Sequence, residues 1–173
     1  DLSCAMESIP KWFKGAQLNF AEHLLRHGGP QPALHFISER DDTVRTITRD
    51  QLRRLVGKTA NALRSVGVKA GDRVAAFCAN VPEVVVFALA AACIGASYAA
   101  ASVDFGADAV VDRFEQIKPM VILVGNAAYY NGKVHDQVDK VKVVMERLES
   151  VERFVVINVI DGHANKISGH PKC

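Results

Sequence analysis

One short segment constrains the fold more than any other. Residues 73–79 contain the run Val-Ala-Ala-Phe-Cys-Ala, which is apolar at successive positions. A strand with one face in water alternates apolar and polar side chains, whereas a strand covered on both faces is apolar throughout. The run therefore predicts a strand inside a sheet that has helices on both faces. Such sheets are mostly parallel, because the covering helices connect neighbouring strands through right-handed crossovers.

The rest of the chain continues this alternation of strands and helices. Further strands are expected at 97–102, 120–124 and 154–160, and helices at 20–27, 48–66, 82–94, 107–117 and 137–148. Two short strand-like runs, 33–38 and 44–47, flank a polar tetrapeptide and predict a hairpin. The predicted fold class is α/β: an open, mostly parallel sheet with helices on both faces and a small N-terminal hairpin.

Polar residues and a glycine indicate where two of these helices begin or end. Thr48 and Gln51 have the spacing of a capping box, in which each side chain bonds the backbone N–H of the other residue. Asn19 and Glu22 have the same spacing at the start of the first helix. Gly67 stands where a helix ends in a left-handed residue.

Length and charge limit the classes of function. At 173 residues the chain is about the size of one domain. Its net charge is +2, from 21 basic and 19 acidic residues whose signs are interleaved. Nothing in that balance favours binding to nucleic acid or to an anionic membrane. No apolar run reaches the roughly 18 residues that a membrane-spanning helix needs.

The ends of the sequence and its cysteines indicate a piece of a longer, cytosolic chain. The sequence begins at Asp1 with no initiating Met and no signal peptide, and its closing residues are polar. Its four Cys residues have no C-x-x-C spacing, and Cys78 and Cys93 lie in apolar segments. We therefore expect reduced thiols that serve as small core residues.

The common nucleotide-binding and catalytic motifs are missing. No G-x-G-x-x-G follows a strand, and residues 131–133, Asn-Gly-Lys, lack the upstream glycine and the following hydroxyl residue of a P-loop. His23 and His27 have the i, i+4 spacing of a zinc pair, but no third ligand accompanies them. Ser102 lacks the G-x-S-x-G context of a nucleophile, so we interpret it as a turn residue. We predict no catalytic residue and no metal site.

The candidate ligand site comes from position in the fold. In open α/β sheets, ligands bind where the strands end, and the segments 102–106 and 125–133 each follow a predicted strand as a loop at the same edge. The second loop carries two aromatic rings, an amide and a cation: Tyr129, Tyr130, Asn131 and Lys133. Such a set suits a phosphorylated nucleotide, although a solvated loop with a surface lysine explains the same composition.

Several segments, in their order along the chain, carry a family resemblance. Residues 10–22, Pro-Lys-Trp-Phe-Lys-Gly-Ala-Gln-Leu-Asn-Phe-Ala-Glu, resemble the amino-terminal signature of acyl-CoA synthetases of the acetyl/acetoacetyl branch. Residues 67–75, Gly-Val-Lys-Ala-Gly-Asp-Arg-Val-Ala, are similar to a segment found across AMP-forming ligases. Residues 102–106 and 130–133 look specifically like the acetoacetyl-CoA synthetases of this family.

The resemblance implies an enzyme that joins acetoacetate to CoA. In that family ATP and acetoacetate, with Mg²⁺, give acetoacetyl-AMP and pyrophosphate, and the thiol of CoA then takes the acyl group. The family works in the cytosol, where it directs ketone bodies into lipid and fatty acid metabolism. Its phosphate loop, ribose-binding aspartate and adenylating lysine lie downstream of the segment that this chain matches. The chain alone is therefore expected to be inactive as a ligase and to bind no cofactor tightly.

The same resemblance supplies the domain assignment. Residues 1–160 are expected to form the amino-terminal α/β subdomain of a larger adenylation domain, and residues 161–173 a polar linker or a truncated continuation. The expected partners are the remainder of the synthetase chain and the small molecules acetoacetate, CoA and ATP.

The resemblance carries over a binding site only for CoA. The positions that contact the 3′-phosphate of CoA in acetyl-CoA synthetases correspond to Tyr130 and Lys133, so one cation is lost and one is kept. The stretch that contacts the CoA adenine corresponds to Ser102, Val103 and Asp104. Two alternatives remain open: a non-catalytic α/β interaction module, or part of a related acetyl- or propionyl-CoA synthetase.

Overall fold

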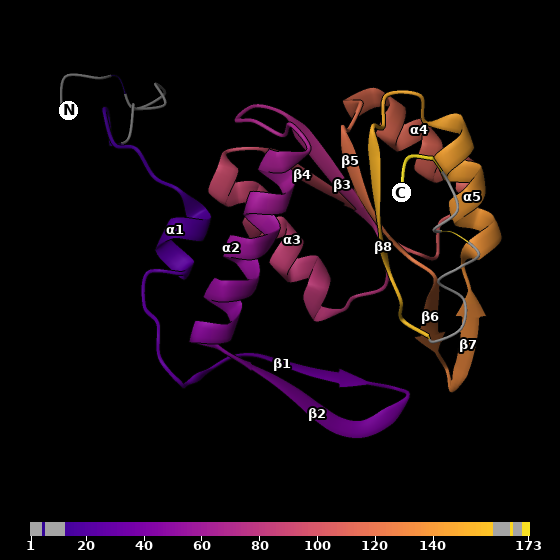
Figure 1. The fold of residues 1–173 in the computed structure, drawn as a ribbon, viewed down its shortest axis with the longest axis horizontal. Helices are drawn as coiled ribbons and strands as arrows, with labels where there is room; N and C mark the ends of the chain where they lie inside the picture. Colours follow the sequence, from indigo (N-terminus) through magenta and orange to yellow (C-terminus); the bar gives the residue numbers. More distant parts are fainter. Residues whose placement is uncertain (1–4, 6–12, 161–166, 168–170) are drawn as a thin grey trace.

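The computed structural model describes residue 5, residues 13–160, residue 167 and residues 171–173. Helices and strands alternate along most of this length (Figure 1). In chain order they are α1 Phe20–Leu24, β1 Pro32–Ser38, β2 Asp41–Thr48, α2 Arg49–Ser65, β3 Arg73–Phe77, α3 Pro82–Ile94, β4 Ser97–Ala101, α4 Ala107–Ile117, β5 Val121–Gly125, β6 Ala127–Tyr130, β7 Lys133–Asp136, α5 Val138–Arg147 and β8 Arg153–Ile157.

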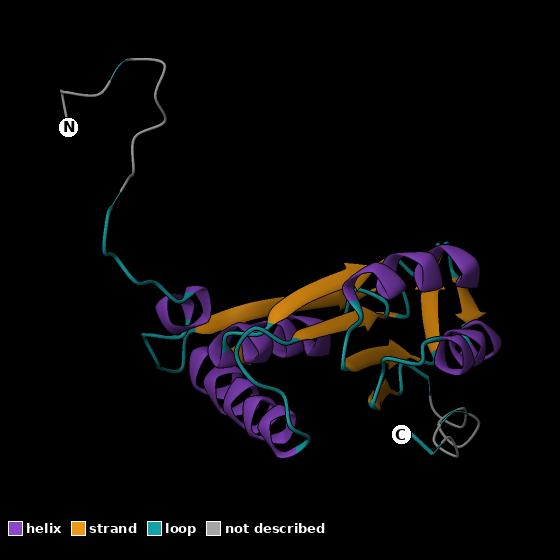
Figure 2. Ribbon diagram, turned by 90° about the horizontal axis from the view of Figure 1, so that it is seen from above, coloured by secondary structure: helices purple, strands orange, loops and turns teal. Residues whose placement is uncertain are grey.

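The largest sheet in the described part of the chain has four parallel strands in the order β4-β3-β5-β8. Helices α2 and α3 lie on one side of it, and α4 and α5 lie on the other (Figure 1). The view from above likewise shows helices on both sides of the strands (Figure 2). The predicted fold class, an α/β fold with an open parallel sheet, is confirmed.

The apolar run of β3 is explained by the two layers of helices. Val74 and Ala76 belong to the core that α2 and α3 cover, whereas Ala75 and Phe77 belong to the core beneath α4 and α5. All four side chains are buried. Because successive side chains of a strand point to opposite faces, a strand between two cores is apolar at every position.

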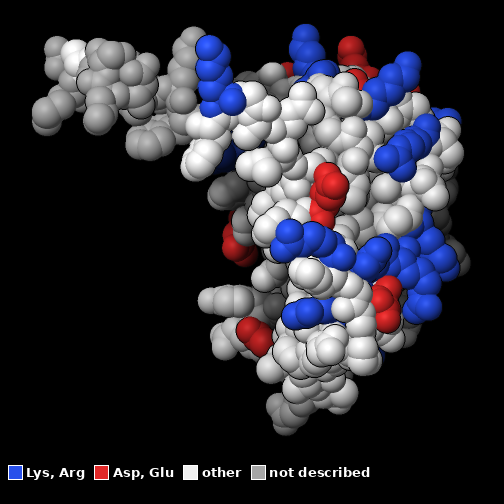
Figure 3. All heavy atoms as spheres, turned by 90° about the vertical axis from the view of Figure 1, so that its left-hand side faces the viewer, with Lys and Arg blue, Asp and Glu red and all other residues white. Residues whose placement is uncertain are grey.

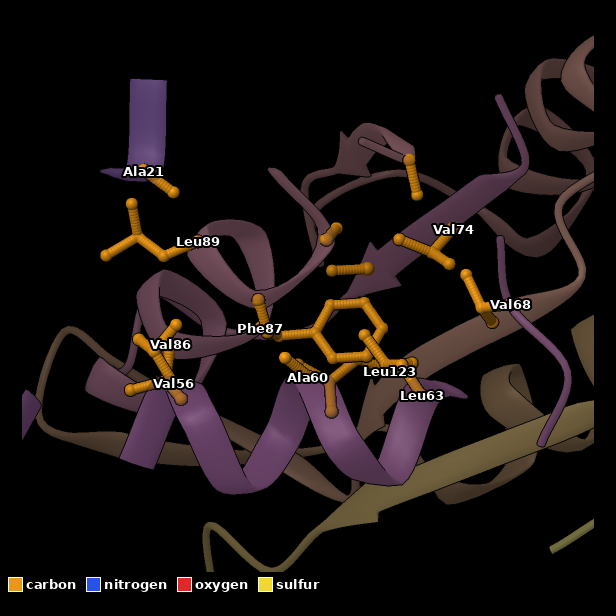
Figure 4. Packing of buried hydrophobic residues seen from close by; sticks show 14 of the residues in the cluster. Ala21, Val56, Ala60, Leu63, Val68, Val74, Val86, Phe87, Leu89 and Leu123 are labelled. Atoms are coloured by element: carbon orange, nitrogen blue, oxygen red, sulfur yellow. The ribbon is translucent and has the colours of Figure 1, made fainter. Parts of the chain in front are cut away.

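The core under α2 and α3 contains a closely packed set of aliphatic side chains around Phe87 (Figure 4). Val56, Ala60 and Leu63 line the inner face of α2 at the i, i+4 and i+7 positions. Phe87 also meets the ring of Tyr98 edge-on, with 6.3 Å between the ring centroids. Full burial of a side chain such as Leu63 contributes about 1.5–3 kcal/mol to folding.

Helix α2 begins as the capping box predicted from Thr48 and Gln51. The Thr48 N–H donates to Gln51 Oε1 at 2.8 Å, and the Gln51 N–H donates to Thr48 Oγ1 at 3.2 Å. Gly67, after the end of the helix, has the positive φ of 94° that the sequence predicted. Both ends of the helix therefore follow the polar and glycine signals of the sequence.

Helix α1 is shorter than the predicted span of 20–27: it ends at Leu24. Asn19 caps its start as expected, accepting the Glu22 N–H at 3.0 Å, and its Nδ2 also donates to Ala92 O of α3 at 2.8 Å. Of the residues in α1, Ala21 is the buried one. So short a helix has little stability of its own, and one buried side chain gives too little packing to stabilise further helical turns.

The hairpin predicted near the amino terminus is present as the antiparallel pair β1 and β2. A second hairpin, β6–β7, was not predicted, since residues 125–133 were expected to form a loop. Asn131 and Gly132 form its two-residue turn, with φ angles of 52° and 69°. Both values are positive, as the tight hairpin turns that Asn-Gly favours require. The expected loop, residues 125–133, therefore runs from the last residue of β5 through β6 and the hairpin turn to the first residue of β7.

Two described parts of the segment 161–173 contact the domain. Ile167 is buried in the core beneath α4 and α5, and the Phe154 N–H of β8 donates to Lys172 O at 2.8 Å. The remaining expectation of a polar linker, for residues 161–166 and 168–170, lies outside the described residues, as do the first residues of the segment 10–22.

The small net charge is unevenly distributed over the surface. Figure 3 looks onto the side of the molecule that bears α1 and α2, where Lys and Arg side chains outnumber acidic ones. The exposed positions of α2 include five basic residues: Arg49, Arg53, Arg54, Lys58 and Arg64. The charges interleave along the whole sequence, but this helix face is basic. In the described residues, none of the helices combines the length and the hydropathy needed to cross a bilayer.

Candidate functional site

The two segments singled out by the sequence meet at one pocket. A cavity of 590 Å³ lies where β3 and β4 end, between the 102–104 segment and the β6–β7 hairpin. Its lining residues are Cys78, Ala79, Asn80, Val84, Ala100, Ala101, Ser102, Val103, Asp104, Ala128, Tyr129, Tyr130, His135, Gln137 and Lys140. Four of the five predicted site residues therefore line one pocket, and Lys133 is the exception.

The segment after β4 is held in shape by its own side chains. Ser102 Oγ donates to Asp104 Oδ2 at 2.9 Å and lies 3.3 Å from the Asp104 N–H, from which it accepts. The Phe105 N–H closes the turn by donating to Ser102 O at 3.2 Å. The Ser102 hydroxyl is therefore bonded within its own turn, which agrees with its interpretation as a turn residue.

The β6–β7 hairpin places aromatic rings at the rim of the pocket. His135 Nε2 lies 3.3 Å from Tyr130 O, and the rings of Tyr130 and His135 are 6.3 Å apart between centroids. Lys133 pairs with Tyr130 across the turn. It also stands two residues before His135, and residues i and i+2 of a strand share a face. Lys133 is thus exposed on the strand face that continues the pocket, beyond its lining.

The turn of this hairpin also contacts the first hairpin. The Gly132 N–H donates to Glu39 Oε2 at 3.1 Å, and the Arg40 guanidinium lies 6.0 Å from the centroid of the Tyr129 ring. A second cavity, of 620 Å³, lies between the two hairpins and includes Tyr129 in its lining. None of the five residues that the resemblance assigns to CoA lines this second cavity, although Tyr129 of the candidate ligand loop does.

Two lining residues from the start of α5 were not expected from the sequence. Lys140 Nζ donates to Val103 O at 2.7 Å and lies 5.9 Å from the centroid of the Phe77 ring. Gln137 is 5% exposed, and its Oε1 atom has no hydrogen-bond partner. The sequence offered one signal for these two residues: a helix begins soon after the Asn131-Gly132 turn. The chain reverses at that turn, and this brings the first turn of the helix back to the edge of the sheet.

A buried asparagine fixes the base of the hairpin. Asn126 is fully buried, and its Nδ2 donates to Ile160 O at 2.9 Å. Its Oδ1 accepts the N–H groups of Val159 and Ile160, at 2.8 and 3.3 Å. Its backbone N–H donates to Ile157 O, and its carbonyl accepts the Gln137 N–H at 3.0 Å. Asn126 therefore connects the ends of β5 and β8 to the start of α5.

Cys78 lines the pocket but is not suited to act as a nucleophile. Burial, with a smaller contribution from the Glu83 carboxylate, raises the pKa of the Cys78 thiol to about 12. The thiolate, which is the reactive form, is therefore scarce at neutral pH. A Cβ atom added at Gly125 would lie 2.7 Å from Cys78 Sγ, so the two residues are in close contact. Cys78 is half-buried, lines the pocket and belongs to neither core cluster, so it forms part of the pocket wall and not of the core as expected.

Comparisons with known proteins agree with this architecture. The family described as AMP-binding enzyme matches residues 20–170. An acetoacetyl-CoA synthetase from Xenopus tropicalis is 42% identical over 158 residues, which are 91% of this chain and 24% of that protein. One from Rhizobium meliloti (strain 1021) is 45% identical over 138 residues, covering 80% of this chain and 21% of that protein.

A solved structure gives the same likeness in three dimensions. The acetoacetyl-CoA synthetase from Streptomyces lividans superposes with a TM-score of 0.84 and 37% sequence identity, covering 89% of this chain and 24% of that chain. The present chain therefore spans about a quarter of the length of the relatives that it matches.

Proposed function

Because this chain belongs to the family of AMP-binding enzymes, we propose that it is the amino-terminal portion of an acetoacetate–CoA ligase and forms part of the CoA-binding surface. The full-length enzyme activates acetoacetate with ATP and Mg²⁺ to acetoacetyl-AMP, releasing pyrophosphate. The thiol of CoA then attacks the mixed anhydride, and AMP leaves. We place this reaction in the cytosol, as the family resemblance implies.

One observation supports the CoA assignment above the others. The 102–104 segment and the strand that carries Tyr130 are separated in the chain by α4 and β5, yet they line the same 590 Å³ pocket. This pocket lies at the carboxyl ends of β3 and β4, where ligands of open α/β sheets bind. The pocket therefore joins both of the segments that resemble CoA-contacting stretches of related enzymes.

The pocket offers groups suited to the nucleotide end of CoA. Tyr129, Tyr130 and His135 present ring surfaces on which a base can stack. Lys133, on the adjoining strand face, can meet a phosphate as a point charge. Lys140 holds the 102–104 segment in place through Val103 O. No group of three or more His, Cys, Asp or Glu side chains that could hold a metal occurs in the described residues.

Binding of CoA and dephospho-CoA to the chain, measured by isothermal titration calorimetry, tests the proposal. A charge-assisted contact with the 3′-phosphate contributes about 1.5–3 kcal/mol, so Lys133→Ala should weaken CoA binding about 10- to 150-fold. Dephospho-CoA lacks that phosphate and should bind both forms equally.

Lys142→Ala is the matched control, because Lys142 is exposed on α5 and does not line the pocket. It should leave both affinities unchanged. Equal CoA affinity in the parent chain and in Lys133→Ala would assign Lys133 to the solvated surface. Absence of CoA binding by the parent chain would contradict the CoA surface as a whole.

A further inference from the structure

Two buried residues with amide side chains, Asn126 and Gln137, are bonded to each other through their backbones, and of the two only Gln137 lines the pocket. Asn126 is fully buried, and both of its amide atoms are hydrogen-bonded to backbone groups. Gln137 is 5% exposed, but its Oε1 has no hydrogen-bond partner. A hydrogen bond joins the backbones of the two residues, since the Gln137 N–H donates to Asn126 O. The same part of the fold thus satisfies one amide and leaves the oxygen of the other unpaired.

An unpaired buried amide oxygen lowers the stability of the chain. It has lost its water partners on folding and has gained no protein donor in return. A leucine or methionine at this position would fill similar space without that penalty. The presence of Gln137 is therefore better explained by a donor that arrives with a ligand than by a contribution to folding.

The surroundings of Gln137 define what kind of ligand brings that donor. The pocket that Gln137 lines also carries the rings of Tyr129, Tyr130 and His135, which suit a flat base. A carboxamide matches the N7 edge of adenine, because its oxygen accepts from the 6-amino group while its nitrogen donates to N7. Along that same edge a 6-oxo purine presents two acceptors, N7 and O6, and so cannot satisfy the amide oxygen there.

We propose that Gln137 recognises the 6-amino group of the adenine of CoA, and that it makes the pocket selective for adenine over 6-oxo purines. This inference rests on the proposed CoA surface and adds a specificity-determining residue to it. Oε1 is inaccessible in this arrangement, so a change of the Gln137 rotamer must turn the whole amide, oxygen and nitrogen together, toward a base in the pocket. The 102–104 segment, held by Lys140, forms the facing part of the pocket.

The test compares adenosine 3′,5′-bisphosphate with inosine 3′,5′-bisphosphate by isothermal titration calorimetry on this chain. The two nucleotides differ only at the edge that Gln137 is proposed to recognise. The parent chain should prefer the adenosine compound about 5- to 150-fold, the range of discrimination that one bidentate amide–base contact gives. Gln137→Leu and Gln137→Met should reduce that preference to about twofold or less.

Gln116→Leu is the matched control. Gln116 is an exposed amide on α4 whose Nε2 bonds Asp112 O at 3.1 Å, and it does not line the pocket. This variant should keep the full preference. Thermal unfolding provides a second readout: Gln137→Leu should unfold at the same temperature as the parent chain or higher, because it removes an unpaired buried acceptor.

Each other result has a definite meaning. Equal binding of both nucleotides by the parent chain would overturn the role of Gln137 while leaving the CoA surface intact. Binding of neither nucleotide would overturn both proposals. If the Leu and Met variants lose stability or fail to fold, Gln137 is a structural residue and the inference is wrong. A preference that persists in folded Leu and Met variants would refute it equally.

Discussion

Asn126 should be one of the most sensitive positions in the chain. Replacement by alanine removes an amide whose Nδ2 donates to Ile160 O and whose Oδ1 accepts the N–H groups of Val159 and Ile160. Two backbone donors and one backbone acceptor lose their partners. The side chain is fully buried, so the change also leaves a small cavity.

The expected loss of stability follows from these three hydrogen bonds. Each contributes about 0.5–1.5 kcal/mol net, and unpaired groups that stay buried cost more. Because the Val159 and Ile160 groups are only partly buried, water can reach some of them. We therefore expect Asn126→Ala to lower the free energy of unfolding by about 2–4 kcal/mol. That is a large part of the roughly 5–15 kcal/mol by which a domain is stable.

Urea unfolding, followed by circular dichroism, measures the change. The midpoint for Asn126→Ala should fall while the slope stays the same, because the surface exposed on unfolding hardly changes. Asn158→Ala is the control: Asn158 lies in the same connection but is exposed. It should change stability by less than about 0.5 kcal/mol. An Asn126→Ala variant as stable as the Asn158→Ala variant would refute the role assigned to this network.

Two further predictions concern reactivity. The pKa of the Cys78 thiol is raised to about 12, which lowers its thiolate fraction at about pH 8 roughly 1000-fold relative to an ordinary thiol. Iodoacetamide should therefore modify the exposed Cys173 in the native chain and Cys78 only after unfolding, as peptide mass mapping can show. Equal modification of the two in the native state would contradict the raised pKa of Cys78. The chain alone should also show no acetoacetate-dependent exchange of pyrophosphate into ATP, because it carries none of the family's adenylating motifs; exchange above the protein-free background would contradict this.

Local sequence patterns were sufficient to predict the parallel sheet and its covering helices. Residues 74–77 of β3 are apolar at every position because each faces one of two cores, and this pattern is visible without knowing which helices supply those cores. The start of α2 was equally clear, since Thr48 and Gln51 satisfy each other's backbone over three residues. Features of this kind depend on residues that are close in the sequence.

The second hairpin shows a signal that was present but misinterpreted. Asn131-Gly132 is a strong two-residue turn signal. It stood between two runs of four residues, 127–130 and 133–136, that are too short to indicate strands by alternation. Together with Lys133 the same two residues match part of a phosphate loop, which is a competing interpretation of this segment. The pairing that makes these runs strands is a contact between them, which neither run indicates alone.

The composition of the pocket was decided by tertiary structure. Ser102, Val103, Asp104 and Tyr130 could be expected near one another, because parallel strands end at one edge of the sheet. Gln137 and Lys140 join them because the start of α5 meets the segment after β4, as the hydrogen bond from Lys140 to Val103, 37 residues earlier, shows. The unpaired oxygen of Gln137 is likewise invisible in the sequence. Whether a buried amide finds a partner depends on atoms brought together from distant segments, and only the packed chain determines which atoms those are.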